Sequence, residues 1–130
     1  MLHLERPLVF FDLEATGTDP QAARIIQIGM QRFVPSEDGA ALDETIDVLV
    51  DPEEEIPAAV TDLTGLSPDA VRQAPPLGAH LDRIAPLLAD ADLAGYNALA
   101  YDIPLLQAEF ERHGRTLPGP DDRVVLDPYR

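Results

Sequence analysis

The chain has 130 residues, 45% of them hydrophobic, which suits one folded domain and argues against intrinsic disorder. It has no cysteine, so disulfide bonds, zinc–thiolate sites and cysteine nucleophiles are excluded. Its 24 acidic and nine basic residues give a net charge of −15, which argues against a simple nucleic-acid-binding module, because such modules neutralise phosphates with basic side chains.

The composition also indicates where the protein works. The apolar stretches are no longer than a strand, and no basic segment precedes a long apolar one at the N-terminus. We therefore expect no membrane span, no secretory signal and a cytoplasmic location. The acid excess is what a salt-rich cytoplasm would favour, and it predicts that molar potassium chloride raises the thermal stability.

The first predicted strand, residues 7–13, leads directly into acidic residues. Asp12 and Glu14 belong to an apolar run that stops at Thr16-Gly17. Because side chains alternate along a strand, both carboxylates project on one side, about 6.5 to 7 Å apart along the backbone. Acids in a buried strand are costly unless a cation neutralises them, and hard divalent ions prefer oxygen ligands. The pattern predicts a magnesium or manganese site; the plainer alternative is two solvated acids at a strand end.

The remaining elements follow in chain order. Two strands, over residues 24–34 and 42–50, are joined by a polar hairpin turn at 35–39. A short helix begins at Ala58 and another at Ser67-Pro68, a capping serine followed by a first-turn proline. A helical stripe with Pro86 inside it covers 77–88, a strand covers 93–96, a helix covers 100–113 and a last strand covers 124–127. Strands that pair first and then alternate with helices predict a layered α/β fold.

Several of these segments form an ordered set of motifs. Residues 12–17 read Asp-Leu-Glu-Ala-Thr-Gly, residues 24–29, 56–57 and 63–67 follow, and residues 96–102 read Tyr-Asn-Ala-Leu-Ala-Tyr-Asp. In this order they resemble the DnaQ-like (DEDD) 3′-5′ exonucleases, a family that includes the proofreading epsilon subunit of bacterial DNA polymerase III. Tyr96 and Tyr101 depart from the His and Phe usual in the family's second motif.

The resemblance implies a ribonuclease H-like α/β fold, a mixed five-stranded sheet of order 3-2-1-4-5 with packed helices, C-terminally truncated. It also implies that Asp12, Glu14 and Asp102 are catalytic and bind two Mg²⁺ or Mn²⁺ ions, although Asp102 alone could simply be an acid favoured at a helix N-terminus. Asp127 matches an acid often found at the end of the fifth strand and is not assigned to metal. Substrate contacts are implied at Leu13, Thr16, Gly17, Leu66 and Asn97.

The implied activity is hydrolysis of a DNA or RNA 3′ end to nucleoside 5′-monophosphates, with a polymerase or repair protein as partner. The family's third motif, a histidine followed five residues later by an aspartate, is not found, because Leu8, Ala85 and Pro118 stand at that distance from the three histidines. We therefore expect residues 1–130 to be an incomplete exonuclease domain with little activity alone. The alternative is a non-catalytic binding or scaffold module with the same fold. The oligomeric state is left open, and an exposed apolar sheet face would allow a dimer.

Overall fold

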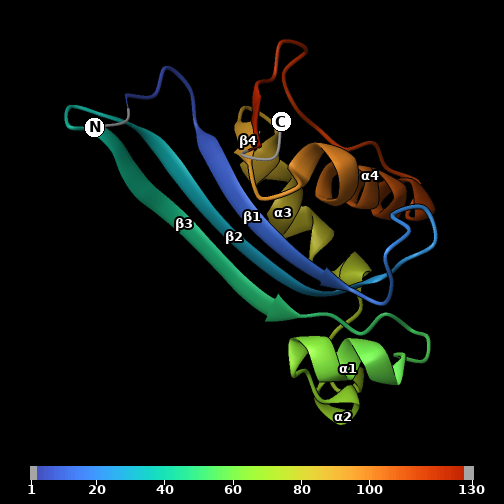
Figure 1. Ribbon diagram of the computed structural model, residues 1–130. Coiled ribbons are helices and arrows are strands. Elements are labelled where there is room, and N and C mark those ends of the chain that lie inside the picture. Colours follow the sequence, from blue (N-terminus) through green and yellow to red (C-terminus); the bar gives the residue numbers. More distant parts are fainter. Residues whose placement is uncertain (1–2, 128–130) are drawn as a thin grey trace.

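The computed structural model describes residues 3–127, which form a five-stranded sheet with helices packed against it (Figure 1). The strands are β1 (Leu8–Ala15), β2 (Ile25–Ser36), β3 (Gly39–Leu49), β4 (Asp92–Ala94) and β5 (Val125–Leu126). Their order in the sheet is β3-β2-β1-β4-β5, as predicted. β2 runs antiparallel to both β1 and β3, whereas β1, β4 and β5 are parallel.

The side chains of the central strand β1 alternate between an apolar face of the sheet and a face of mixed polarity. Val9, Phe11 and Leu13 are at most 5% exposed and belong to the hydrophobic core, together with residues of α3 (Leu81–Leu88) and α4 (Ile103–Arg112). Phe10 and Asp12 alternate with them on the other face and are exposed, as the two-residue period of a strand requires. We call this second face, with Phe10 and Asp12 at its centre, the open face.

The smaller helices lie beyond the end of the sheet. α1 (Ala58–Thr64) and α2 (Pro68–Arg72) follow β3 and lie below its C-terminal end in Figure 1. As predicted, the Ser67 side chain caps α2 by accepting a hydrogen bond from the Ala70 amide. Within residues 3–127, no helix is long and apolar enough to cross a membrane.

The predicted helix over residues 77–88 is divided. A 3₁₀ turn, η1 (Leu77–Ala79), precedes α3, and the break falls at His80 rather than at Pro86, which lies inside α3. The apolar stripe is nevertheless confirmed, because Leu77, Leu81, Ile84 and Leu88 are all buried. The later helix also differs at its start: a π-helical turn, η2 (Ala98–Asp102), leads into α4, which ends before Gly114 in the left-handed conformation.

The hairpin between β2 and β3 is tighter than predicted. Pairing continues through Pro35 with Ala40 and Ser36 with Gly39, so only residues 37 and 38 form the turn. Pro35 fits in β2 because β1 does not extend beyond the pair of Leu8 with Phe33. At Pro35, β2 is therefore an edge strand on the side of β1, where a proline is tolerated. The last strand is shorter than predicted, with two residues in place of four.

Candidate active site

Three acids predicted from the sequence lie at the same edge of the sheet. Asp12 and Glu14 are near the C-terminal end of β1, and β4 runs parallel beside β1. Because parallel neighbouring strands end at the same edge, the turn η2 that follows β4 lies beside the acids of β1. Asp102 is the last residue of this turn.

The pKa of Asp102 reflects both its burial and the acids around it. Its side chain is buried, with 5% exposed, and burial is the main reason that its pKa is raised to about 7; Asp12, Glu14 and Asp127 raise it further. Burial, followed by the charge of Asp12, also raises the pKa of Glu14. The fold thus gathers four carboxylates from β1, η2 and the end of β5.

Within residues 3–127, no arginine forms an ion pair with Asp12, Glu14 or Asp102. The ion pairs of the described residues join arginines to acids elsewhere in the fold. Hard oxygen donors with uncompensated charge suit Mg²⁺ or Mn²⁺. In the described part of the chain, however, no three acidic or histidine side chains are close enough to enclose an ion, so a bound cation would have to draw the carboxylates together.

Asp127 makes hydrogen bonds to η2 that the sequence did not predict. Its carboxylate accepts hydrogen bonds from the backbone amides of Asn97 (3.2 Å) and Leu99 (3.0 Å), at the start of η2. Asn97 adopts the left-handed conformation, with φ of 59°, a conformation that asparagine tolerates better than most residues. Asp127 therefore connects β5 to the turn that presents Asp102, and π-helical turns of this kind are frequent at functional sites.

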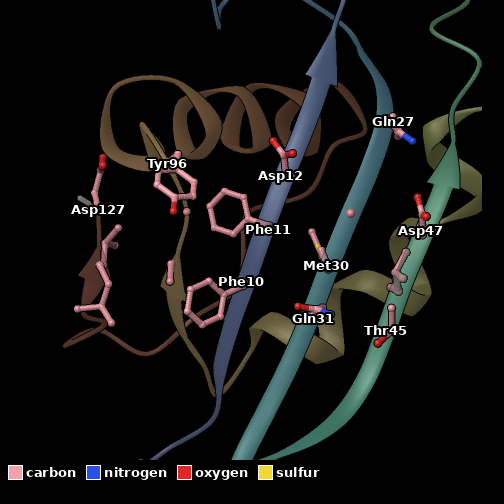
Figure 2. A pocket seen from close by; sticks show the side chains of 16 residues that line it. Phe10, Phe11, Asp12, Gln27, Met30, Gln31, Thr45, Asp47, Tyr96 and Asp127 are labelled. Atoms are coloured by element: carbon pink, nitrogen blue, oxygen red, sulfur yellow. The ribbon is translucent and has the colours of Figure 1, made fainter. Parts of the chain in front are cut away.

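A groove on the open face begins at two of these acids, Asp12 and Asp127. It has a volume of about 1070 Å³, and Asp12, Asp127, Tyr96 and Phe10 are among the residues that line it (Figure 2). It extends across β2 to Thr45 and other residues of β3 (Figure 2). The acids thus lie next to a surface wide enough to accept a ligand.

Two of the residues predicted to contact substrate have side chains directed into the fold. Leu13 is 5% exposed and belongs to the core, because it alternates with Asp12 and Glu14, so its side chain does not reach the open face; its contact with substrate stays a prediction. Thr16 is also buried, and its hydroxyl oxygen accepts a hydrogen bond of 2.9 Å from the Arg24 amide. Contact with a substrate at these positions would have to come from the backbone.

The other three predicted substrate residues remain accessible to differing degrees. Asn97 is exposed at the start of η2, next to the acids. Gly17 is partly exposed and its carbonyl oxygen accepts a hydrogen bond from the Tyr101 hydroxyl. Leu66 is half-buried in the segment between α1 and α2, and it is not among the residues that line the groove. Their contact with substrate stays a prediction.

The sheet order, with acids on the central strand and after β4, is that of a ribonuclease H-like fold. The chain belongs to the exonuclease family, because the family model described as Exonuclease (RNase_T) matches residues 9–127.

Similar sequences include large bacterial polymerases. DNA polymerase III PolC-type of Clostridium perfringens is 30% identical over 122 residues, which are 93% of this chain and 8% of that protein. The PolC-type polymerase of Streptococcus sanguinis is 31% identical over 106 residues, 82% of this chain and 7% of that protein. The chain therefore spans less than a tenth of the length of these relatives.

Solved structures of exonuclease I share the fold. A product-bound exonuclease I matches 95% of this chain and 30% of that chain, with a TM-score of 0.80 and 22% identity. E. coli exonuclease I in complex with a dT13 oligonucleotide matches 95% of this chain and 28% of that chain, with a TM-score of 0.80 and 20% identity. Both comparisons support the ribonuclease H-like architecture.

Proposed function

We propose that this protein is a metal-dependent 3′-5′ exonuclease that hydrolyses a DNA or RNA 3′ end and releases nucleoside 5′-monophosphates. The observation that carries the proposal is the group formed by Asp12, Glu14, Asp102 and Asp127 at one edge of the sheet, where burial and mutual repulsion raise the pKa of Asp102 to about 7. The exonuclease family assignment supports it.

In this proposal Asp12, Glu14 and Asp102 would hold two Mg²⁺ or Mn²⁺ ions, which would supply Lewis-acid activation of water and charge stabilisation of the leaving group. The backbone at Gly17, together with Leu66 and Asn97, orients the terminal nucleotide. The rigid strand β1 keeps Asp12 and Glu14 on one face, so both carboxylates approach the substrate from the same side.

The substrate and partner follow by analogy with the relatives. One structural neighbour was solved with a dT13 oligonucleotide, which favours a single-stranded DNA 3′ end over RNA. The sequence relatives are polymerases by name, which favours a polymerase as the partner over a repair protein.

Neither His80 nor His113 is among the groups that act on Asp102, so neither is a candidate for the general base. His113, at the end of α4, directs Nδ1 at the carbonyl oxygen of Glu109 (2.8 Å), and His80 lies at the start of α3. The side chains that act on Asp102 are all carboxylates. We therefore infer that residues 1–130 alone hydrolyse nucleic acid slowly or not at all. The same observation favours the second candidate, a non-catalytic binding or scaffold module.

Metal binding provides the first test. Titration calorimetry with Mn²⁺ should show binding to this chain and its loss in Asp12→Ala, because that carboxylate is one of the proposed metal ligands. Asp47→Ala is the matched control, since Asp47 lines the same groove from β3 but is not one of the proposed ligands. Equal Mn²⁺ binding by the wild type and Asp12→Ala would refute the proposed site.

A second test separates the enzyme from the scaffold. The full-length gene product is incubated with Mn²⁺ and a 5′-labelled single-stranded oligonucleotide, and the products are separated by length. The exonuclease predicts a ladder that shortens from the 3′ end, with nucleoside 5′-monophosphates released, and no ladder with Asp12→Ala. Oligonucleotide that is bound but remains intact would support the scaffold instead.

A further inference from the structure

Tyr101 bridges the two segments that carry the acids. Its hydroxyl group donates a hydrogen bond of 2.5 Å to the carbonyl oxygen of Gly17, 84 residues away in the sequence. Gly17 follows Glu14 closely along the chain, and Tyr101 directly precedes Asp102. This hydrogen bond thus joins the segment that follows Asp12 and Glu14 to the turn η2, which carries Asp102.

The acceptor of this hydrogen bond is itself held in place. The amide of Thr16, the neighbour of Gly17, donates to the carbonyl oxygen of Arg24 (2.9 Å), and the Arg24 amide donates to the Thr16 hydroxyl oxygen (2.9 Å). This pair of bonds closes the loop between β1 and β2. The Tyr101 ring is half-buried and packs against the hydrophobic core. Both ends of the contact are therefore fixed.

The hydrogen bond between Tyr101 and Gly17 lies where three acids repel one another. Asp12, Glu14 and Asp102 repel one another, and no arginine within residues 3–127 forms an ion pair with them. Repulsion favours separation of η2 from β1. The hydrogen bond from Tyr101 to Gly17 joins η2 to the end of β1 and so opposes this separation. Because both groups are neutral, the bond leaves the negative charge of the acids available to a cation. An arginine in the same place would compete with the cation.

We propose that Tyr101 is a positioning residue, whose hydrogen bond to Gly17 holds Asp102 beside Asp12 and Glu14 so that they can bind divalent cations. The proposal rests on the proposed function, because it concerns the same metal site. Phenylalanine, usual at this position of the motif, fills the same space but cannot donate this hydrogen bond. The contact is therefore a feature of this chain's own sequence.

The test uses Tyr101→Phe and a control that loses a side-chain hydrogen bond elsewhere. Ser67→Ala removes the side-chain cap of α2 and leaves the acids untouched. For the wild type and both variants, we would measure the Mn²⁺ dissociation constant by calorimetry and the stability of the metal-free chain by urea unfolding. We expect Tyr101→Phe to weaken Mn²⁺ binding about fivefold, the value of one net hydrogen bond, and Ser67→Ala to leave the dissociation constant unchanged.

Each outcome has a distinct meaning. Weaker Mn²⁺ binding by Tyr101→Phe, with both variants folded and similar in stability, supports the positioning role. Wild-type affinity in Tyr101→Phe, even with lowered stability, makes the contact merely structural and overturns the inference, while the proposed function stands. Absence of Mn²⁺ binding by the wild type overturns the metal site and the inference together.

Discussion

Asp102 illustrates a conflict between stability and function at a single residue. Its carboxylate is 5% exposed, lies near three other acids, and forms no ion pair with the arginines described within residues 3–127. Burying an ionised carboxylate without a partner destabilises a fold. A chain selected for stability alone would place a neutral side chain here, and the proposed role of Asp102 as a metal ligand offers a reason for the acid.

The pKa of Asp102 predicts a pH dependence in the absence of metal. The pKa of Asp102 is about 7 in the folded chain, whereas an ordinary aspartate has a pKa of 3.8. As the pH rises, Asp102 therefore loses its proton at a lower pH in the unfolded chain than in the folded chain. The free energy of unfolding should therefore fall as the pH rises from about 4 to about 7, and stay reduced above it. Asp102→Asn should remove this contribution and stabilise the chain at pH 8 by on the order of 3 to 4 kcal/mol.

Urea unfolding of the wild type and Asp102→Asn at pH 5 and pH 8, with a chelator present, would check this prediction. Asp47→Asn serves as the control, because Asp47 is exposed on the same open face. An asparagine variant that is less stable than the wild type at pH 8 would show that the charged carboxylate is stabilised by a partner.

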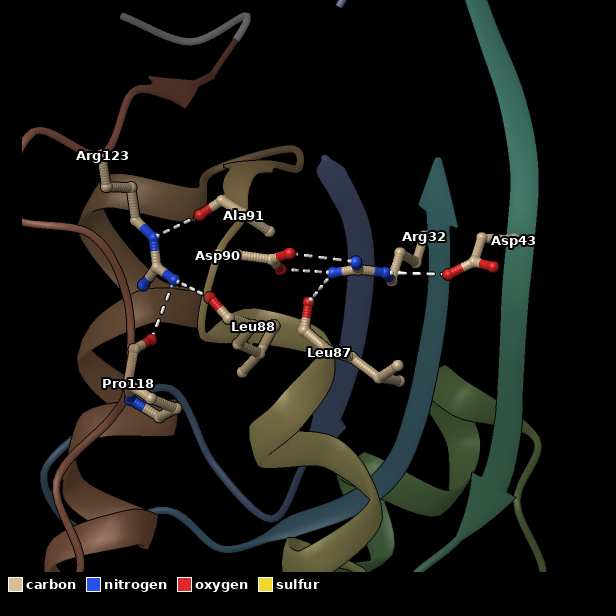
Figure 3. A network of polar contacts seen from close by, with 8 residues as sticks. All are labelled: Arg32, Asp43, Leu87, Leu88, Asp90, Ala91, Pro118 and Arg123. Carbon is tan, nitrogen blue, oxygen red and sulfur yellow. Dashed lines mark hydrogen bonds and ion pairs between the residues drawn. The ribbon is translucent and has the colours of Figure 1, made fainter. Parts of the chain in front are cut away.

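At the scale of elements, β5 is too short to hold itself in the sheet. It has two residues, and its backbone bonds to β4 are few. Arg123, two residues before β5, donates to the carbonyl oxygens of Ala91 (2.8 Å), Pro118 (2.8 Å) and Leu88, and so attaches the chain to the C-terminal end of α3 (Figure 3). On the other side of the same helix end, Arg32 donates to the Leu87 carbonyl oxygen (Figure 3). Two arginines thus satisfy carbonyl groups that a helix terminus leaves without partners.

Arg123→Ala should therefore release β5. Loss of three hydrogen bonds from a charged, partly buried donor is expected to cost roughly 2 to 3 kcal/mol of unfolding free energy. It should also speed hydrogen exchange at the amides of Leu93 and Gly95, which donate to the carbonyl oxygens of Val124 and Leu126.

Arg115→Ala is the control for this prediction, because Arg115 pairs with the exposed Asp82 and such surface pairs contribute less than about 1 kcal/mol. Equal losses of stability in the two variants, or unchanged exchange at Leu93 and Gly95, would contradict the role given to Arg123.

The whole molecule carries an uncompensated charge of −15. Most described arginines already pair with acids, so the excess is spread over acids that repel one another. The open face also leaves Phe10, Leu42 and Leu126 about half exposed. Dimerisation through such a face stays a prediction, and the net charge of each copy opposes it at low salt.

Salt should stabilise the fold by screening this repulsion. We expect the melting temperature to rise by several degrees between about 0.05 M and 1 M potassium chloride, because the Debye length shortens from more than 10 Å to about 3 Å. Sucrose at equal osmolality separates screening from solvent exclusion, which also stabilises folded proteins. A melting temperature that does not change with potassium chloride, or that rises equally in sucrose, would contradict the electrostatic explanation.

Local patterns in the sequence were enough to predict the elements of the fold and two of the site acids. Alternating and helical patterns are local signals, so all five strands were predictable, with errors confined to element ends and to the break at His80; the strand order came from the resemblance to a known family. The placement of Asp12 and Glu14 on one face also follows from strand geometry alone. The same alternation directs the Leu13 side chain into the core, so any contact of Leu13 with substrate would come from its backbone.

The surroundings of these acids depend on tertiary packing and could not be predicted from the sequence. The burial of Asp102, the contacts of Asp127 with η2 and the bond from Tyr101 to Gly17 join segments far apart in the chain. The attachment of β5 by Arg123 is of the same kind. No local pattern encodes such contacts, because they depend on how whole elements pack, and the energy of a buried charge depends on every group brought near it.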